Sequence, residues 1–274
     1  MSSNGLKDLK DDLQKFEIRL KKSFGQNFLH DPVAINRIMD ACNIKHSDWV
    51  VEIGAGSGYL TSALAINAHQ VTAIEIDTDL RPLLLKTTGL TSNIKLIFGD
   101  VLEMDLSSLK PTVVVGNLPY YCSSAILRRW ANQTPDVPAF FMLPEDVVKH
   151  LLASPGDPSY TAFSVYAQYA FSFKKLFEVH PSSFFPRPNV GSAFVSFDQP
   201  KTPRLPKRAE DHFIRVVEGA FMLRRKTMVN SLSEAGFDTD DVKSAMSFIG
   251  LEPNVRGETL NVDQFKRLAG FIPH

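Results

Sequence analysis

Short apolar runs alternate with helical segments through the first half of the chain. The runs are rich in β-branched and aromatic residues, and they predict buried strands at residues 49–53, 71–76, 94–98, 112–116 and 139–143. A glycine-rich turn and a helix from Ser57 to about Ile66 follow the first run. This repeated order of strand and helix predicts a parallel sheet with right-handed crossovers.

The pattern changes after residue 144. An apolar helix is predicted at 160–169, followed by strands at 171–179 and 192–197 that are candidates for an antiparallel pair. Three prolines between Pro200 and Pro206 are typical of a linker. Beyond Glu210 the chain is predicted to be helical, at residues 213–223, 226–235, 239–249 and 262–269.

These elements predict the α/β fold class. We expect a Rossmann-like sheet with helices on both faces, joined to a small all-α domain. The expected boundaries are residues 1–22 for an N-terminal extension, 23–200 for the α/β domain and 207–274 for the helical domain. An early helix over 35–41 is also predicted, with Asp31 as its N-cap and Pro32 at its first position.

Composition restricts the class of protein. A chain of 274 residues, of which 44% are hydrophobic, is long enough for one large domain and a small one. Its two cysteines, Cys42 and Cys122, exclude a disulfide framework or a cysteine metal site, and sparse thiols suit a reducing compartment. No apolar run approaches a transmembrane span, and the polar N-terminus lacks the apolar segment of a signal peptide. We therefore expect a cytoplasmic protein that has no membrane partner.

Charge gives two opposing indications about nucleic acid. The formal net charge is zero and the sequence pI is about 7.1, whereas dedicated nucleic-acid-binding domains usually have a pI above about 9. Locally, however, basic side chains gather in three clusters, at residues 15–22, 201–208 and 224–226. Any one such cluster is usually a solvated face, so the clusters indicate a nucleic-acid partner only in combination with other features.

A nucleotide-binding unit is predicted by the first strand, its glycine turn, the helix and a second strand that ends in an acid. Gly54 and Gly56 allow a tight turn and a close approach of the backbone to a ligand. Glu75 follows the turn by about 20 residues, a spacing at which a carboxylate binds both hydroxyls of a ribose. Asp100, at the end of the third strand, is placed to accept a hydrogen bond from the amino group of an adenine.

The spacing of the turn favours S-adenosylmethionine over NAD. The glycines follow the pattern G-x-G-x-G, and Tyr59 stands where a dinucleotide fingerprint has its last glycine. Glu52 places a carboxylate beside the turn, where it would repel a pyrophosphate and attract a sulfonium or an ammonium group. A glycine turn without a ligand is the remaining alternative.

The motif Asn117-Leu118-Pro119-Tyr120 follows the fourth strand, at the edge of the sheet where ligands bind. The amide oxygen of Asn117 and the carbonyl of Leu118 are placed to accept hydrogen bonds from one exocyclic amine. Pro119 fixes the turn, and the ring of Tyr120 offers a face for a planar base. The motif therefore predicts an aromatic amine as the reacting group, although by itself it is also typical of a turn that ends a strand.

Seven motifs occur in a fixed order: Ser23–Leu29, Val51–Gly58, Glu75–Asp77, Gly99–Asp100, Gly116–Tyr121, Phe184–Ala193 and Phe221–Thr227. Each is weak alone, but their order and spacing together are specific. From about Lys21 to its C-terminus, the chain resembles the ribosomal RNA adenine N6,N6-dimethyltransferases, which modify small-subunit RNA near its 3′ end.

The resemblance implies a methyltransferase fold that uses S-adenosyl-L-methionine, and a helical domain from about Glu210 that contacts RNA. It implies dimethylation of two adjacent adenines in the RNA of the assembling small ribosomal subunit, and we expect the enzyme to be a monomer. The implied catalytic residues are Asn117, Leu118, Pro119, Tyr120 and Phe184, with Tyr120 and Phe184 on either side of the flipped adenine. The expected cofactor-binding residues are Asn27, Leu29, Gly54, Gly56, Glu75, Asp100 and Asn117.

The chain departs from the family pattern at three positions. Tyr121 stands where the family commonly has a smaller polar residue, which affects the expected shape of the base pocket. Asn189 and Gly191 replace a Lys and an Asp of the family, and the first of these changes removes a basic residue from a region that could contact RNA.

Three other functions stay open at this point. The first is the same chemistry on large-subunit RNA or on DNA. The second is a non-catalytic nucleic-acid-binding protein on a methyltransferase fold, against which the presence of Asn117 and Glu75 argues. The third is an NAD oxidoreductase, against which Tyr59 and Glu52 argue.

Overall fold

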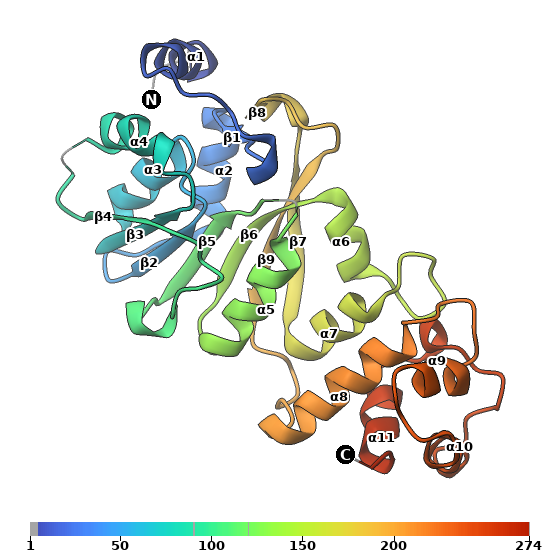
Figure 1. The fold of residues 1–274 in the computed structure, drawn as a ribbon. Coiled ribbons are helices and arrows are strands. Elements are labelled where there is room, and N and C mark those ends of the chain that lie inside the picture. The colour runs from blue at the N-terminus through green and yellow to red at the C-terminus, as the bar shows by residue number, and fades with distance from the viewer. Residues whose placement is uncertain (1–4, 90, 120, 274) are drawn as a thin grey trace. The chain divides into compact units, whose positions relative to one another are not determined.

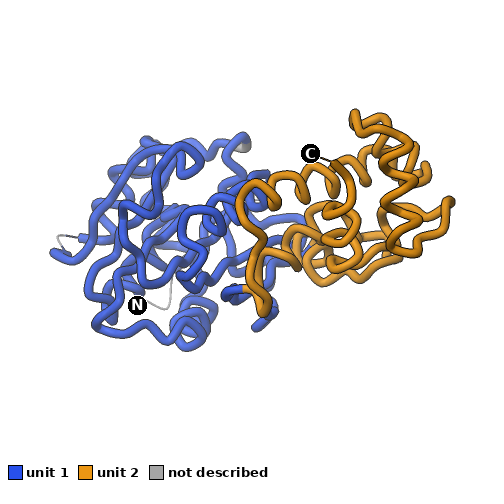
Figure 2. Tube along the Cα trace, turned by 90° about the horizontal axis from the view of Figure 1, so that it is seen from below, with its two compact units in different colours: residues 1–145, 173–199 blue, residues 146–172, 200–274 orange. Residues whose placement is uncertain are grey.

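The computed structural model of the protein describes residues 5–273 except Leu90 and Tyr120. The chain divides into two compact units, which are coloured separately in Figure 2. The first comprises residues 1–145 and 173–199, and the second comprises residues 146–172 and 200–274.

The described part of the first unit contains a seven-stranded sheet, with the strand order β4-β3-β2-β5-β6-β9-β7 (Figure 1). Its strands are β2 (Trp49–Ile53), β3 (Gln70–Glu75), β4 (Ile94–Phe98), β5 (Val113–Asn117), β6 (Ala139–Pro144), β7 (Ser172–Val179) and β9 (Ser192–Asp198). The neighbours from β4 to β6 pair in parallel, and β9 pairs antiparallel with β6. The predicted α/β class is confirmed, and each predicted strand agrees with an observed one to within one residue at either end.

Both faces of the sheet are covered because the central strands are apolar on both sides. Val113 and Val115 of β5 belong to the core cluster beneath α2 (Pro32–Cys42), α3 (Tyr59–Asn67) and α4 (Arg81–Thr88). On the other face, Trp130 of α5 (Ser123–Gln133) packs edge-on against Phe141 and Phe197, with ring centroids 5.9 and 6.0 Å away. This two-sided burial is typical of a parallel sheet.

Helix α2 begins as its sequence predicts. The side chain of Asp31 accepts a hydrogen bond from the backbone N–H of Val33 at 2.9 Å, and Pro32 is the first helical residue. The helix ends at Asn43, whose left-handed backbone lets its N–H reach the Met39 carbonyl.

The N-terminal segment forms elements that the hydrophobic pattern did not predict. Helix α1 (Gly5–Lys15) buries Leu9 and Leu13, and its Asp12 forms an ion pair with Lys86 of α4. Further on, the short strand β1 (Phe28–Leu29) pairs antiparallel with β8 (Phe184–Phe185). Within the predicted N-terminal extension, α1 therefore packs on the first unit.

The described part of the second unit is helical. Its elements are most of α6 (Glu145–Leu152), α7 (Ala162–Ala170), α8 (Lys207–Ala220), α9 (Met228–Glu234), α10 (Thr239–Phe248) and α11 (Val262–Phe271). Tyr169 of α7 packs on Phe213 of α8 at 4.6 Å between ring centroids, and its hydroxyl donates to Glu210 at 2.8 Å. The segment 146–172 was expected to belong to the α/β domain, and these contacts with α8 are why it lies with the helical unit. Among the described residues, every helix is too short or too polar to cross a lipid bilayer.

A close contact joins the end of β6 to the start of β9. The backbone N–H of Glu145 donates to the carbonyl of Gly191 at 3.0 Å, and the Glu145 carboxylate lies over the Gly191 α-carbon. A Cβ at position 191 would meet the end of the Glu145 side chain, which would then have to turn aside.

One acid, Glu52, is enclosed near the end of the central strand β2. Its side chain is 1% exposed, and one of its carboxyl oxygens has no hydrogen-bond partner among the described residues. Burial, assisted by the charge of Glu75, raises the pKa of Glu52 to about 8. In the free protein at neutral pH this group is therefore mostly protonated, so the charge that we expected it to present to a cation is largely absent.

We predict that Glu52→Gln stabilises the free protein increasingly as the pH rises. Below the ordinary pKa of a glutamate, both the folded and unfolded wild-type chains carry a protonated Glu52. Between that value and about 8 the unfolded chain ionises first, so the wild-type protein loses free energy of unfolding on the order of 4 kcal/mol. Denaturant unfolding at a series of pH values measures this, with Glu103→Gln at an exposed position as control. A difference between wild type and Glu52→Gln that does not change with pH would contradict a buried, protonated Glu52.

Candidate active site

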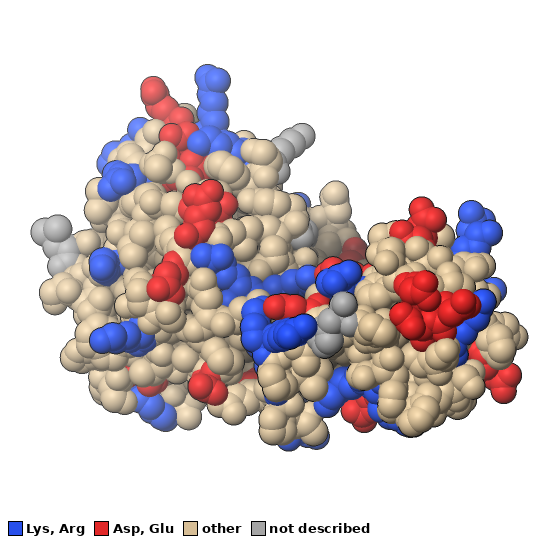
Figure 3. Space-filling view, turned by 60° about the horizontal axis from the view of Figure 1, so that its bottom comes forward, with Lys and Arg blue, Asp and Glu red and all other residues tan. Residues whose placement is uncertain are grey.

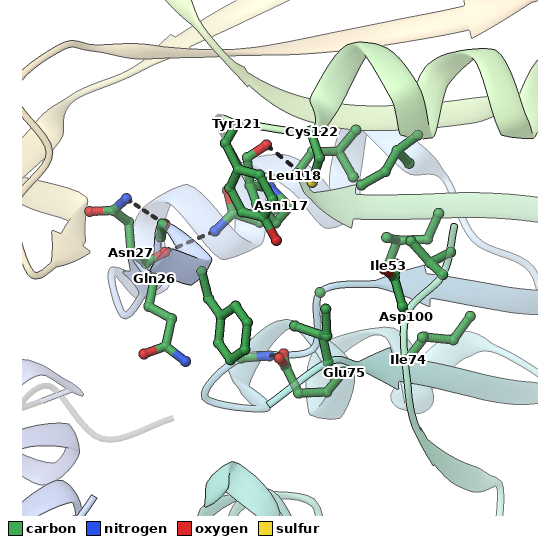
Figure 4. Close-up of a pocket in the computed structure, with 18 of the residues that line it drawn as sticks. Gln26, Asn27, Ile53, Ile74, Glu75, Asp100, Asn117, Leu118, Tyr121 and Cys122 are labelled. Carbon is green, nitrogen blue, oxygen red and sulfur yellow. Dashed lines mark hydrogen bonds between the residues drawn. The ribbon is translucent and has the colours of Figure 1, made fainter. Parts of the chain in front are cut away.

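A pocket opens at the carboxyl ends of the four neighbouring parallel strands β4, β3, β2 and β5 (Figure 4). The space within it is about 710 Å³, which includes volume open to solvent. Strands β2 and β5 lie at its centre, where the chain order of the sheet reverses. This is the position at which open α/β sheets bind ligands.

Two glycines bring β2 and β5 together below the pocket. A Cβ added at Gly54 would lie 3.1 Å from the carbonyl oxygen of Asn117, and one added at Gly116 would lie 2.7 Å from the carbonyl oxygen of Ile53. Gly54 also has a φ of 81°, in the left-handed region that favours glycine. Gly54 and Gly56 both line the pocket, and the close approach of the backbone to a ligand at these glycines stays a prediction.

Glu75 lies at the end of β3 with its carboxylate against the pocket. The side chain is 7% exposed and accepts hydrogen bonds from the backbone N–H groups of Gly56 at 2.8 Å and Asp77 at 2.9 Å. Burial raises the pKa of Glu75, and the two N–H donors oppose that shift. The carboxylate is thus held in one orientation, with lone pairs left for the hydroxyls of a ribose.

Asp100 lines the pocket just beyond β4, and one carboxyl oxygen caps the following turn by accepting from the N–H of Leu102 at 2.8 Å. Two apolar side chains, Ile76 and Val101, line the same part of the pocket. Sequence reasoning missed them, although each directly follows an acid at a strand end. Acceptors beside apolar walls suit a flat base with an exocyclic amine.

The Asn117 side chain points into the pocket from the end of β5 (Figure 4). Its amide nitrogen donates to the backbone carbonyl of Asn27 at 2.9 Å. Because that contact occupies the nitrogen, the amide oxygen faces the other way and is the group available to a donor. Asn27 comes from the N-terminal arm, defined here as residues 16–27, which forms one wall of the pocket.

The rest of the predicted turn after β5 is only partly described. Leu118 and Pro119 line the pocket, whereas Tyr120 lies outside the described residues. Tyr121 and Cys122 line it as well, and Tyr121 is 59% exposed at the mouth. The aromatic residue at the departure position 121 therefore lies at the mouth of the pocket.

Two predicted site residues lie apart from the main pocket. Leu29 and Phe184 pair directly in the β1–β8 ladder, and both are buried in the core cluster. Phe184 is only 3% exposed and is not among the described residues that line the pocket. Leu29 lines a smaller adjoining hollow together with Glu52 and Asn117. The short antiparallel pairing explains both positions, and sequence periodicity over two residues could not have shown it.

Several cations of the predicted basic clusters have internal partners. Lys21 forms ion pairs with Asp77 and Asp79, and Arg204 with Glu210. The Arg224 guanidinium donates to the carbonyl of Pro158. In the described part of the chain, no group of three or more His, Cys, Asp or Glu side chains is arranged to hold a metal ion. Acidic and basic side chains are interspersed over the face shown in Figure 3.

Known proteins resemble this chain over nearly its whole length. Residues 17–273 match the family described as ribosomal RNA adenine dimethylase. A ribosomal RNA small subunit methyltransferase A from Alkaliphilus oremlandii is 35% identical over 96% of this chain and 95% of its own. A protein of the same name from Geobacter metallireducens is 37% identical over 92% of this chain and 95% of its own.

Two crystal structures share the fold. A dimethyladenosine transferase from Plasmodium falciparum has a TM-score of 0.71 at 24% identity, over 88% of this chain and 95% of its own. The 23S rRNA methyltransferase ErmE has a TM-score of 0.65 at 25% identity, over 90% of this chain and 99% of its own. Given the match over residues 17–273 and relatives at 35–37% identity, the chain belongs to the ribosomal RNA adenine dimethylase family.

Proposed function

We propose that this protein transfers methyl groups from S-adenosyl-L-methionine to N6 of two adjacent adenines near the 3′ end of small-subunit ribosomal RNA. The observation that carries the proposal is the Asn117 amide, fixed in one orientation inside a pocket that also holds the Glu75 carboxylate. Family membership supports the enzyme class, and the relatives at 35–37% identity bear a small-subunit name. The enzyme acts as a monomer in the cytoplasm, during assembly of the small subunit.

The pocket fits this cofactor. Gly54 and Gly56 line the pocket without side chains, and Glu75 presents a carboxylate at the distance along the chain expected of a ribose ligand. Asp100 offers an acceptor for an adenine amino group, and the apolar side chains of Ile76 and Val101 line the same pocket. When bound, the cofactor supplies a methyl group made electrophilic by a sulfonium.

The residues of the chain then act mainly by positioning. The Asn117 oxygen and the Leu118 carbonyl accept hydrogen bonds from the two N–H groups of the adenine amine, which favours a pyramidal nitrogen whose lone pair faces the methyl group. Such an arrangement turns a bimolecular encounter into an oriented one. The proton that the adenine nitrogen must lose becomes acidic only once the new N–C bond has formed. Solvent can therefore take this proton, and no strong base is required.

An adenine inside a helix must be flipped out to reach Asn117. In our proposal Tyr120 stacks on one face of the flipped base, which contributes about 1–3 kcal/mol. Phe184 is assigned the second face, but its ring is 3% exposed in the free protein. Binding of RNA therefore has to uncover Phe184, or the exposed ring of Tyr121 takes its place.

The function is tested by incubating the protein with radiolabelled cofactor and small subunits that lack the modification, followed by nucleoside analysis. The expected product is N6,N6-dimethyladenosine at two adjacent positions. Large subunits and DNA serve as competing substrates in parallel reactions. Labelling of either one in preference to small subunits would contradict the proposed substrate.

We predict that Asn117→Ala lowers the methyl-transfer rate by about 100-fold or more, because an oriented acceptor for the target amine is lost. The fold should be retained, since Asn117 is at a strand end and lines a pocket. Asn117→Asp keeps an acceptor but cannot donate to Asn27, so it should also be slow. Single-turnover labelling measures both rates, and near-normal turnover by Asn117→Ala would refute the mechanism.

We predict that Glu75→Ala weakens cofactor binding by about 2–3 kcal/mol, because two charge-assisted hydrogen bonds to ribose are lost. Calorimetric titration with S-adenosylhomocysteine measures this directly and needs no RNA. Glu103→Ala, at an exposed position of the same unit, is the control. Unchanged affinity in Glu75→Ala would remove Glu75 from the cofactor site.

The basic cluster at 224–226 makes a prediction about RNA. Arg225 and Lys226 are exposed, whereas Arg224 holds the Pro158 carbonyl and is left in place. Replacing Arg225 and Lys226 with Ala should reduce the slope of log affinity against log salt by about 1.5, the value for two phosphate contacts. Lys266→Ala with Arg267→Ala removes the same charge from the same unit and should leave the slope unchanged. If the variant of Arg225 and Lys226 keeps the wild-type slope, as the control variant should, the cluster does not touch RNA.

A further inference from the structure

Asp77 is a buried carboxylate that the proposed reaction does not use directly. The residue is 1% exposed and lies two positions after Glu75, whose carboxylate accepts from the Asp77 N–H at 2.9 Å. Its carboxylate oxygens accept hydrogen bonds from Lys21 Nζ at 2.5 Å, from Gln26 Nε2 at 2.6 Å and from the backbone N–H of Asp79 at 3.1 Å. Burial alone would raise the pKa of Asp77, but the donors Lys21 and Gln26 outweigh burial and lower it below its ordinary value.

Both side-chain donors belong to the N-terminal arm. The Gln26 amide also makes a hydrogen bond within the arm, because its oxygen accepts from the backbone N–H of Lys21 at 2.7 Å. Asn27 is fixed by the same turn, since its side chain donates to the Gly25 carbonyl at 2.9 Å. Asp77 thus ties residues 21–27 to the end of β3.

The carbonyl of Asn27 is the group that orients Asn117. It accepts from the Asn117 amide nitrogen at 2.9 Å, from the opposite side of the pocket (Figure 4). If this carbonyl moved away, the amide could turn over and present its nitrogen to the target amine. A donor would then face a donor, and the base would lose its acceptor.

We propose that Asp77 is a positioning residue for methyl transfer, which fixes the acceptor orientation of Asn117 through Lys21, Gln26 and the Asn27 carbonyl. The proposal rests on the function proposed above, because it assigns a task to the Asn117 oxygen. It also couples the cofactor side of the pocket to the side that binds the target base. The end of β3 carries Glu75, the proposed ribose ligand, and Asp77 beside it fixes the orientation of the Asn117 amide that binds the base.

Gln26→Glu tests this chain of contacts with almost no change of shape. The introduced carboxylate still accepts from the Lys21 N–H but cannot donate to Asp77, which it repels. We expect kcat at saturating cofactor and subunits to fall by about 10-fold or more near pH 8, because the acceptor is misplaced. Asp77→Asn should show a comparable loss. Asp79→Asn is the matched control, because Asp79 binds Lys21 at 2.6 Å but has an exposed side chain and no bond to Gln26.

The pH profile separates positioning from simple destabilisation. A carboxyl placed beside the Asp77 carboxylate has a raised pKa, so on going from about pH 8 to about pH 6 it gains a proton and can donate to Asp77 again. The rate of Gln26→Glu relative to wild type should therefore rise as the pH falls. Lys21, Glu75 and Asp79, which surround Asp77, are present in both proteins and cancel in this ratio.

A second readout does not depend on activity. In free protein labelled with nitrogen-15 at asparagine, the Asn117 side-chain amide should show the shift and exchange protection of a hydrogen-bonded group, with Asn117→Ala identifying the signal. That protection should be lost in Asp77→Asn and kept in Asp79→Asn.

If the wild-type protein fails to methylate subunits, the proposed function is wrong, while the amide measurement still tests the contacts between Asp77, the arm and Asn117. Normal kcat in both Gln26→Glu and Asp77→Asn, a ratio independent of pH, or intact protection in Asp77→Asn would each overturn the role of Asp77.

Discussion

The close approach of β2 and β5 at their carboxyl ends is the constraint on which the site depends. The α-carbon of Gly116 packs against the Ile53 carbonyl, and that of Gly54 against the Asn117 carbonyl, at spacings that leave no room for a side chain. Because both positions are glycine, the cofactor turn and the Asn117 amide lie on adjacent strands at the reversal point of the sheet. The remaining groups of the pocket are arranged around this contact.

The N-terminal arm completes the pocket with a wall that differs in chemistry from the wall formed by the strand ends. Strand ends supply carboxylates and carbonyls, which suit the polar edges of a nucleoside. The arm supplies Phe24 to Asn27, and it is held by the charge on Asp77 rather than by a long run of backbone pairing. A wall attached through a few side-chain bonds is easier to open than a strand, which suits a site that must admit a cofactor and release its product.

The sequence allowed the sheet to be predicted well, because its central strands are apolar runs that are bounded by turn residues and largely buried. Glu75, Asp100 and Asn117 could be placed at one edge because they lie at or just beyond the ends of such strands. The arrangement of the N-terminal region could not be predicted in this way. Helix α1 is largely polar with two buried leucines, and the β1–β8 pair joins two-residue segments that are far apart in the chain.

The same limit applies to side-chain environment. The charge of Glu52 was expected to act on a ligand, but the position of this acid under the turn buries it and keeps it mostly protonated. The basic clusters were visible as charge, yet Lys21 and Arg204 turned out to be bound to internal acids. Charge patterns show where cations are along the chain, and only the fold shows which of them are already neutralised.

The contact between Glu145 and Gly191 makes the effect of a substitution at one position depend on the residue at the other. A Cβ at position 191 would meet the end of the Glu145 side chain, so an alanine there requires only that this carboxylate turn aside. An aspartate at 191 would in addition bring a second negative charge close to Glu145. The effects of changes at the two positions are therefore non-additive, even though neither residue lines the described pocket.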